Sequence, residues 1–283
     1  MPSFTTPSPI DLAVHLPVGA LEVVASDRAD TVVTVSPTNP DKAVDRRGAE
    51  ETSVDFDART QTLTVKGPKP RLSWIGPTES VDLRVELPSG SRVTAEISVG
   101  PVRSTGILGA TRIKASTGSV DLEATGDLWL RASHGTATVG AADGSVEITA
   151  DHGQIRLGTV TGDALLKASH GSIQIGDAAG AVEAKLSYGD FEVATARSDV
   201  AAKTAYGSIQ LREVSEGSID IDSGFGEITV GVRHGVPAWL DLSSKEGRVR
   251  NDLDGDHTPV EGEPTVAVRA RTQFGNITVG RAK

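Results

Sequence analysis

Apolar and polar residues alternate over short stretches through the middle of this chain. Between Gly100 and Gly235 a nine-residue phrase recurs: a glycine, any residue, then an apolar, a polar and an apolar position, followed by three or four small or polar residues. Alternation with a period of two over so few residues is typical of a short β-strand, and the glycines at both ends predict tight turns. Two phrases together make a unit of about eighteen residues.

A fixed period of this length predicts a solenoid, in which each repeat buries its neighbours. The glycines that open alternate phrases are Gly100, Gly118, Gly135, Gly153, Gly171, Gly189, Gly207 and Gly226, and the intervening series is Gly109, Gly126, Gly144, Gly162, Gly180, Ser198 and Gly217. Each unit then supplies one strand to each of two facing sheets, with successive strands parallel and ~4.8 Å apart. We therefore expect an all-β fold, a two-sheet parallel β-solenoid with about eighteen residues per rung.

The inward positions of the two expected sheets differ in size in a complementary way. Phe191, the one large ring among them, falls between the phrases that contain Ala184 and Ala202. Large residues beside small ones let a narrow interior reach native packing density. We expect these inward residues to be buried: Val120, Leu122, Ala137, Val139, Ile155, Leu157, Ile173, Ile175, Phe191, Val193, Ile209 and Leu211 in one sheet, and Leu128, Leu130, Val146, Ile148, Ala164, Leu166, Val182, Ala184, Val200, Ala202, Ile219 and Ile221 in the other.

The segments on either side of the repeats should cover the open ends of the solenoid. We expect residues 1–99 to form an N-terminal β cap like a small sandwich or meander, with antiparallel strands and a polar loop from Pro40 to Glu51. Residues 100–235 form the solenoid repeats, and residues 236–283 form C-terminal capping strands packed on it. The last phrase, FGNITVG from Phe274, repeats FGEITVG from Phe225 and should stack on the last rungs.

The amino-acid composition argues against several classes of function. The 283 residues include no cysteine, which excludes disulfides, thiol chemistry and cysteine metal sites. A net charge of −10 argues against general nucleic-acid binding, which needs a cationic surface. The N-terminus lacks a basic region followed by an apolar core, and no window approaches eighteen apolar residues. We therefore expect a soluble, cytoplasmic protein with no nucleic-acid or membrane partner.

The chain resembles the bacterial putative-adhesin family of β-strand-repeat proteins, a family of unknown function, and especially its soluble actinobacterial members. The residues that carry the resemblance are IDLAVHLPVGALEVVASDRADTVVTVSP near the N-terminus, VELPSGSRV before the repeats, the G-x-[VI]-x-[VIL] phrases, VPAWLDL, and VAVRARTQFGNITVG near the end. The resemblance covers essentially the whole chain. It implies the fold but no activity. The chain departs from the family at the residue before the corner glycine, which is commonly Asn or a small residue in family members.

At that corner position the chain instead carries rings. They are His134, His152, His170, Tyr188, Tyr206 and Phe225, with Phe274 in the last phrase. Residues eighteen apart should lie one above the next, so we favour a stacked ladder that stiffens the corner. Two alternatives stay open: a metal or ligand site formed by His134, His152 and His170 with Asp151, and a pH response in which the protonated imidazoles repel one another. Rings ~4.8 Å apart that point the same way do not converge on one ion, so we expect no metal and no cofactor.

The outward positions form rows as well. One sheet should carry a basic row, Lys114, Arg131, Lys167, Lys185 and Lys203, interrupted by Thr149 and flanked by Trp129 and Leu165. Such a row either binds an anionic polymer or acidic partner, or simply keeps the sheet wet, with Glu147 and Glu183 neutralising part of it; we favour the solvated face. The other sheet should present a polar row with Arg156 and Gln174 beside a row of glycines, a trough that suits a glycan, a peptide or a second copy.

No catalytic motif stands out: the chain has no G-x-S-x-G, GxxxxGK[ST] or H-E-x-x-H sequence. We expect a non-enzymatic scaffold or binding module that presents flat sheet faces to a protein or glycan partner, with self-association to a homo-oligomer as a further expectation. The alternative is an enzyme, metal-assisted or not, with a site on the His/Tyr ladder or where cap and solenoid meet. Residues that could meet at that junction are His15, Trp74, His234, Trp239 and His257.

Overall fold

The computed structural model describes residues 2–68, 79–253 and 262–282. Strands account for 67% of the chain and helix for 3%, so the expected all-β class is confirmed. The strands form parallel-stacked sheets, as the expected two-sheet β-solenoid requires. By its internal contacts the chain divides into two compact units, Met1–Asp143 and Gly144–Lys283, which we call unit 1 and unit 2.

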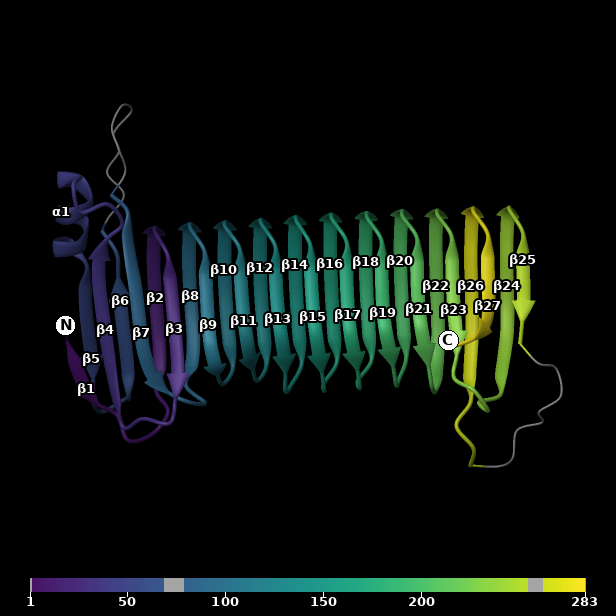
Figure 1. Cartoon of the computed structure of the whole chain (residues 1–283), viewed down its shortest axis with the longest axis horizontal. Coiled ribbons are helices and arrows are strands. Elements are labelled where there is room, and N and C mark those ends of the chain that lie inside the picture. Colours follow the sequence, from purple (N-terminus) through teal and green to yellow (C-terminus); the bar gives the residue numbers. More distant parts are fainter. Residues whose placement is uncertain (1, 69–78, 254–261, 283) are drawn as a thin grey trace. The chain divides into compact units, whose positions relative to one another are not determined.

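Unit 1 consists of two sheets and one helix (Figure 1). Its elements are β1 (Ser3–Thr5), β2 (Asp11–Val18), β3 (Leu21–Ser26), β4 (Asp30–Pro37), α1 (Ala43–Glu51), β5 (Ser53–Asp57), β6 (Thr62–Lys66), β7 (Val81–Pro88), β8 (Arg92–Val99), β9 (Val102–Ile107), β10 (Thr111–Thr117), β11 (Val120–Thr125), β12 (Leu128–His134) and β13 (Ala137–Ala142). Within the unit, sheet A has the order β1-β4-β7-β3-β9-β11-β13 and sheet B the order β5-β6-β2-β8-β10-β12.

The antiparallel N-terminal cap that the sequence predicts is only partly correct. Strands β1, β4 and β5 do pair antiparallel with their neighbours. In contrast, β2 is parallel to β6 and β8, and β3 is parallel to β7 and β9, so these strands form solenoid rungs. Gly19, between β2 and β3, has the positive φ of the other corner glycines, +135°. Alternation predicts a strand but not the direction of its neighbours, which explains the error.

The polar loop predicted at Pro40 to Glu51 is also wrong, because α1 occupies most of it. The carboxylate of Asp45, which is buried, accepts hydrogen bonds from the backbone N–H groups of Asn39 and Ser80, both at 3.2 Å. Arg47 donates to the buried carboxylate of Glu79 at 2.6 Å. These long-range contacts hold a polar helix that hydrophobic periodicity could not reveal.

Unit 2 is built from rungs of two strands, one in each sheet (Figure 1). Its strands are β14 (Val146–His152), β15 (Ile155–Val160), β16 (Ala164–His170), β17 (Ile173–Ala178), β18 (Val182–Tyr188), β19 (Phe191–Ala196), β20 (Val200–Tyr206), β21 (Ile209–Val214), β22 (Gly217–Phe225), β23 (Ile228–Val232), β24 (Ala238–Glu246), β25 (Val249–Asp252), β26 (Val266–Phe274) and β27 (Ile277–Arg281). Sheet A has the order β15-β17-β19-β21-β23-β27-β25, and sheet B has the order β14-β16-β18-β20-β22-β26-β24.

The last rung in sequence is not the last in space. Strands β26 and β27 pair in parallel with β22 and β23, which confirms that the final FGNITVG phrase stacks on the repeats. The earlier rung, β24 and β25, pairs with the other side of β26 and β27 and is outermost in unit 2 (Figure 1). The predicted boundaries at residues 99 and 235 stay predictions.

All the predicted inward residues are buried, and Phe191 is fully enclosed. Phe191 is in register with Ile173 and Ile209, while Ala184 and Ala202 are register partners in the other sheet of the unit. Burying a Val, Leu, Ile or Phe side chain contributes roughly 1.5–3 kcal/mol, so each rung adds its own share of the stability. The two sheets thereby present only their alternate, outward residues for function.

Candidate functional site: the lysine row and the aromatic ladder

The outer face of sheet B in unit 2 carries three lysines on neighbouring strands. Lys167 on β16 is the register partner of Lys185 on β18, and Lys185 is the partner of Lys203 on β20. Thr149 precedes them on β14 and Asp222 follows them on β22. We call Lys167, Lys185 and Lys203 the lysine row. Because neighbouring strands lie ~4.8 Å apart, the three ammonium groups form a closely spaced line of positive charge.

The row is only partly neutralised. Lys185 Nζ lies 2.7 Å from Glu183 Oε1 on the same strand. The hydrogen bond from Lys185, with the charge of Lys167 as a smaller cause, lowers the pKa of the Glu183 carboxyl. Lys167 and Lys203 make no ion pair within the part of the chain that the structure describes. Two lysines of the row thus stay without an ion pair in the described residues, although Glu147, Asp220 and Asp222 share the outer face of β14–β22 with them.

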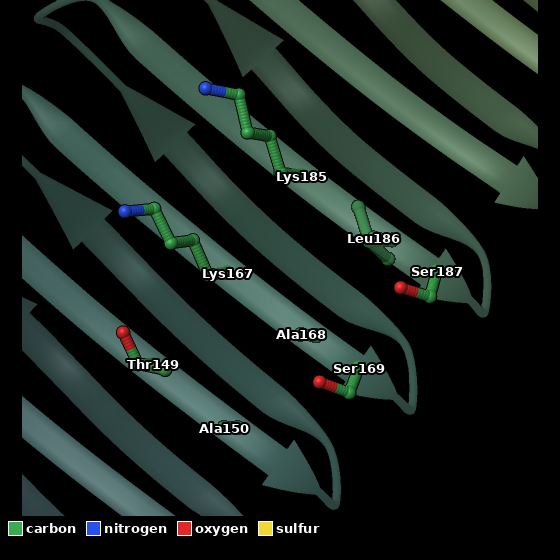
Figure 2. A pocket seen from close by; sticks show the side chains of 8 residues that line it. All are labelled: Thr149, Ala150, Lys167, Ala168, Ser169, Lys185, Leu186 and Ser187. Atoms are coloured by element: carbon green, nitrogen blue, oxygen red, sulfur yellow. The ribbon is translucent and has the colours of Figure 1, made fainter.

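A shallow hollow of about 210 Å³ lies against the lysine row. Figure 2 shows the side chains of Lys167 and Lys185 side by side on neighbouring strands, with Ser169 and Ser187 farther along the same strands. The remaining lining residues are Thr149 and three residues with buried side chains, Ala150, Ala168 and Leu186. The hollow thus combines two cationic groups, hydroxyl groups and a small apolar floor. Sequence analysis missed it, although the serines two positions after each lysine were a visible signal.

The basic residues predicted on the outer face of sheet B in unit 1 differ from the lysine row in their acidic neighbours. Lys114 and Arg131 are register partners, but Lys114 Nζ lies 2.7 Å from Glu96 Oε1, and His15 Nδ1 lies 3.6 Å from the other oxygen of that carboxylate. The hydrogen bond from Lys114 lowers the pKa of Glu96. This acid supplies a counter-charge next to Lys114, so the basic character is stronger in the lysine row of unit 2.

Trp129 does not offer a free ring face. The guanidinium carbon of Arg112, its register partner, lies 3.8 Å from the centre of the Trp129 ring. A cation over an aromatic face is a favourable contact in its own right. Trp129 is half-buried, and one face of the ring is already occupied.

The corner rings of unit 2 form the predicted ladder. Ring centres are 4.8 Å apart from His152 to His170, 5.1 Å from His170 to Tyr188, and 4.9 Å from Tyr188 to Tyr206. The stack continues from Tyr206 to Phe225 at 4.9 Å and from Phe225 to Phe274 at 4.7 Å. Interplanar angles are between 3° and 7° throughout, so the rings are parallel. Each ring face inside the ladder is covered by the next ring.

The ladder therefore presents ring edges and the hydroxyl groups of Tyr188 and Tyr206, which are 50% and 46% exposed. His152 and His170 are stacked and do not converge on one point. His134 belongs to unit 1, where Thr117 is its register partner. No group of three or more His, Cys, Asp or Glu side chains able to hold a metal ion occurs in residues 2–68, 79–253 and 262–282.

The polar row predicted on sheet A is also in register, since Arg156 and Gln174 are partners on β15 and β17. In the neighbouring row of glycines, a side chain at Gly176 would place its Cβ 2.5 Å from the carbonyl oxygen of Gly158. At the same position of the next two rungs the chain carries Ala194 and Arg212. Close packing between strands explains Gly176 without any ligand.

The residues proposed for a site where cap and solenoid meet are divided between the two units. His15 lies in unit 1 beside Glu96, whereas His234 and Trp239 lie in unit 2. Trp74 and His257 fall outside the described residues. Among the helices that the structure describes, none is both long enough and apolar enough to cross a membrane.

Several solved structures are similar to this chain over nearly its whole length. A putative adhesin from Bacteroides fragilis is 14% identical with a TM-score of 0.42, covering 98% of this chain and 95% of that one. A putative adhesin from Parabacteroides merdae is 15% identical with a TM-score of 0.30, covering 100% and 95%. A putative cell adhesion protein from Clostridium sporogenes is 11% identical with a TM-score of 0.24, covering 99% and 98%.

No curated protein matches the chain. The narrower likeness to actinobacterial proteins stays a prediction. The Toastrack family, DUF4097, matches residues 18–280, which include most strands of both units and the corner glycines that fix the repeat. The chain therefore belongs to the Toastrack family.

Proposed function

We propose that this protein is a non-enzymatic binding module, and that the lysine row of unit 2 binds an anionic glycan. The observation that supports the proposal most is the row itself, three lysines in register of which Lys167 and Lys203 have no ion-pair partner in the described residues. The hollow beside Lys167 and Lys185 gives the ligand a place to lie.

The charge of the row selects an anionic partner. A single exposed ion pair contributes only about 0.2–1 kcal/mol, so one carboxylate would bind weakly. A polymer with repeated negative charges can contact several lysines at once, so the small binding free energies of the single ion pairs add up. Positive charge concentrated in one row of an acidic protein also steers such a ligand toward that row.

The surroundings of the row favour a glycan over an extended peptide. The backbone groups of β16, β18 and β20 are used within the sheet, so an extended peptide lying on the outer face cannot add to it as a further strand. Ser169 and Ser187 offer hydroxyl groups that can bond to sugar hydroxyls. The ring faces in the ladder are covered, so recognition rests on charge and hydrogen bonds rather than on stacking.

The proposal is tested by binding to polygalacturonate, with neutral dextran and polyglutamate as comparison ligands. We expect the protein to bind polygalacturonate, less tightly as salt is added because exposed charges are screened, and not to bind dextran. Replacing Lys167, Lys185 and Lys203 together by Gln should weaken binding about tenfold or more, equal to about 1.4 kcal/mol.

The matched control changes three arginines of the same unit that lie outside sheet B to Gln: Arg156 and Arg212 on sheet A, and Arg197 directly after β19. It alters the net charge by the same amount, and its binding should stay within about twofold of the original protein, a difference under about 0.5 kcal/mol. Equal losses in both variants, or tighter binding to polyglutamate than to polygalacturonate, would contradict a glycan site on the lysine row.

The alternative of an enzyme with a site on the ladder gains no support from the geometry. A metal-assisted site needs side chains that converge on one ion. His152 and His170 instead face each other in a parallel stack, with ring planes 3° apart. We therefore propose the binding module alone.

A further inference from the structure

The outermost rung of unit 2 is an open end, independent of the lysine row. Strands β24 and β25 each pair on one side only, with β26 and β27, and they end their sheets. Leu240 and Leu242 occupy inward positions and are half-buried, whereas their register partners Val268 and Ala270 are fully buried. Trp239 is 60% exposed and Val249 46%. Apolar surface beside unpaired strand edges invites another chain to pair.

The backbone groups on this end are available for pairing. Val266 N–H donates to the carbonyl of Pro237, and Ile277 N–H donates to that of Arg248, which sets the alternation of the parallel ladder. The N–H and C=O groups of Leu240, Leu242 and Ser244 in β24, and of Val249 and Asn251 in β25, then point away from their neighbours. In the described part of the chain no strand pairs with this edge.

We propose that a second copy of this chain docks on the open end through a two-fold axis, with β24 pairing antiparallel with β24 of the copy and β25 with β25. An axis through Ser243 also passes near Asn251, because each is four residues from the corner at Gly247. Both strands can therefore pair at once. In this register the outward-pointing backbone groups of Leu242 and Ser244 bond to each other across the axis.

The charges on the open end are self-complementary in that register. Lys245, which has no ion-pair partner in the described residues, faces Asp241 of the copy. On the other sheet Arg250 faces Asp252 of the copy; within one chain these two already lie 2.7 Å apart. The two-fold axis makes each of these pairs occur twice. All four lie at non-hydrogen-bonded positions, where facing side chains approach most closely.

The size of the end predicts a weak dimer. Nine residues of strand span about 30 Å and the two sheets lie about 10 Å apart, so the contact is smaller than a standard specific interface and belongs to the weak class. In unit 1 the outermost strands differ, because β1 and β5 are short and pair antiparallel with their neighbours. The exposed, parallel end of unit 2 is therefore the surface that fits a second copy.

Sedimentation equilibrium of the full chain, from about 1 µM to about 1 mM, tests the proposal across the range expected for a weak interface. We expect a monomer–dimer equilibrium. Arg250→Asp alone places two acids opposite each other twice, and Asp252→Arg alone does the same with two bases, so each should weaken the dimer about tenfold or more. The double variant Arg250→Asp and Asp252→Arg restores opposite charges and should bind within about threefold of the original chain.

The Lys167, Lys185 and Lys203 triple variant serves as the control that separates this proposal from glycan binding, and it should dimerise like the original chain. Circular dichroism checks that every variant is folded. A monomer at all concentrations, dimers unaffected by either single change, or a double variant as weak as the singles would overturn the proposed pairing.

Discussion

Single residues decide the shape of each corner. The glycines of the series from Gly100 to Gly226, which includes those that follow the corner rings, have φ between +136° and +157°, a region that side chains rarely adopt. A Cβ there would also meet the carbonyl oxygen of the preceding rung, at 2.0 Å for Gly118 and 2.2 Å for Gly189. The intervening series is uneven, because Ser198 occupies one of its positions, whereas a Cβ at Gly180 would lie 2.4 Å from the carbonyl oxygen of Gly162 and Gly217 has a φ of +99°.

The difference between Gly118 and Gly126 gives a prediction inside unit 1. Gly118→Ala should lower the free energy of unfolding by about 2–4 kcal/mol, because it combines a forbidden φ with a backbone clash. Gly126→Ala, at the other corner, has its nearest atom 3.4 Å away and no positive φ, and should change stability by less than about 1 kcal/mol. Denaturant unfolding of both variants measures this, and equal effects would show that the corners do not differ.

At the residue scale much could be predicted from the sequence. Inward positions such as Phe191 follow from alternation, which is a local property. Which glycines need a positive φ could not be derived from the sequence, because φ depends on how the next rung stacks. Ser198 indicated an ordinary backbone conformation at its own corner, yet Gly217 in the same series has a φ of +99°.

At the scale of strands, the ladder links one rung to the next outside the core. Its rings repeat at nearly the spacing of the strands, so the same register that buries the core also stacks the rings. The sequence predicted this ladder from the eighteen-residue spacing of its rings. It could not predict strand direction near the N-terminus, because β2 and β3 pair with strands far along the chain.

The ladder should contribute to stability through ring contact rather than through the tyrosine hydroxyls. Tyr206 stacks on both Tyr188 and Phe225, and each aromatic pair is worth about 0.5–1.5 kcal/mol. Tyr206→Ala should therefore cost about 1–3 kcal/mol, whereas Tyr206→Phe should stay within about 0.5 kcal/mol of the original chain. Thermal and denaturant unfolding would distinguish them, and similar losses in both variants would assign the stability to the hydroxyl group.

At the scale of the molecule, each inner rung of unit 2 pairs with only the rung before and the rung after it. The order of rungs follows the sequence until β24 and β25, where β26 and β27 intervene. A repeat of this kind predicts the order in which its inner rungs stack. Terminal rungs deviate from the repeat, so their stacking order could not be derived from it. The hollow beside the lysine row likewise depends on three strands together.

Nearest-neighbour pairing predicts that a whole rung can be removed. Deleting residues 180–197 removes β18 and β19 and brings β16 next to β20 with every side chain on its original face. We expect a folded protein with cooperative thermal unfolding. Deleting residues 180–188 removes β18 alone and forces each later strand into the opposite sheet, so that variant should not fold. Circular dichroism would show both results; two folded deletions, or two unfolded ones, would contradict the eighteen-residue rung.

The most direct test of the proposed function is to map which lysines a bound glycan covers. Lysine acetylation of the folded protein, followed by mass spectrometry, measures the reactivity of each side chain with and without polygalacturonate. We predict that Lys167, Lys185 and Lys203 become several-fold less reactive, while Lys114 in unit 1 and Lys245 on the open end keep their reactivity. Equal protection of all five lysines, or protection of Lys114 and Lys245 alone, would contradict a binding site on the lysine row.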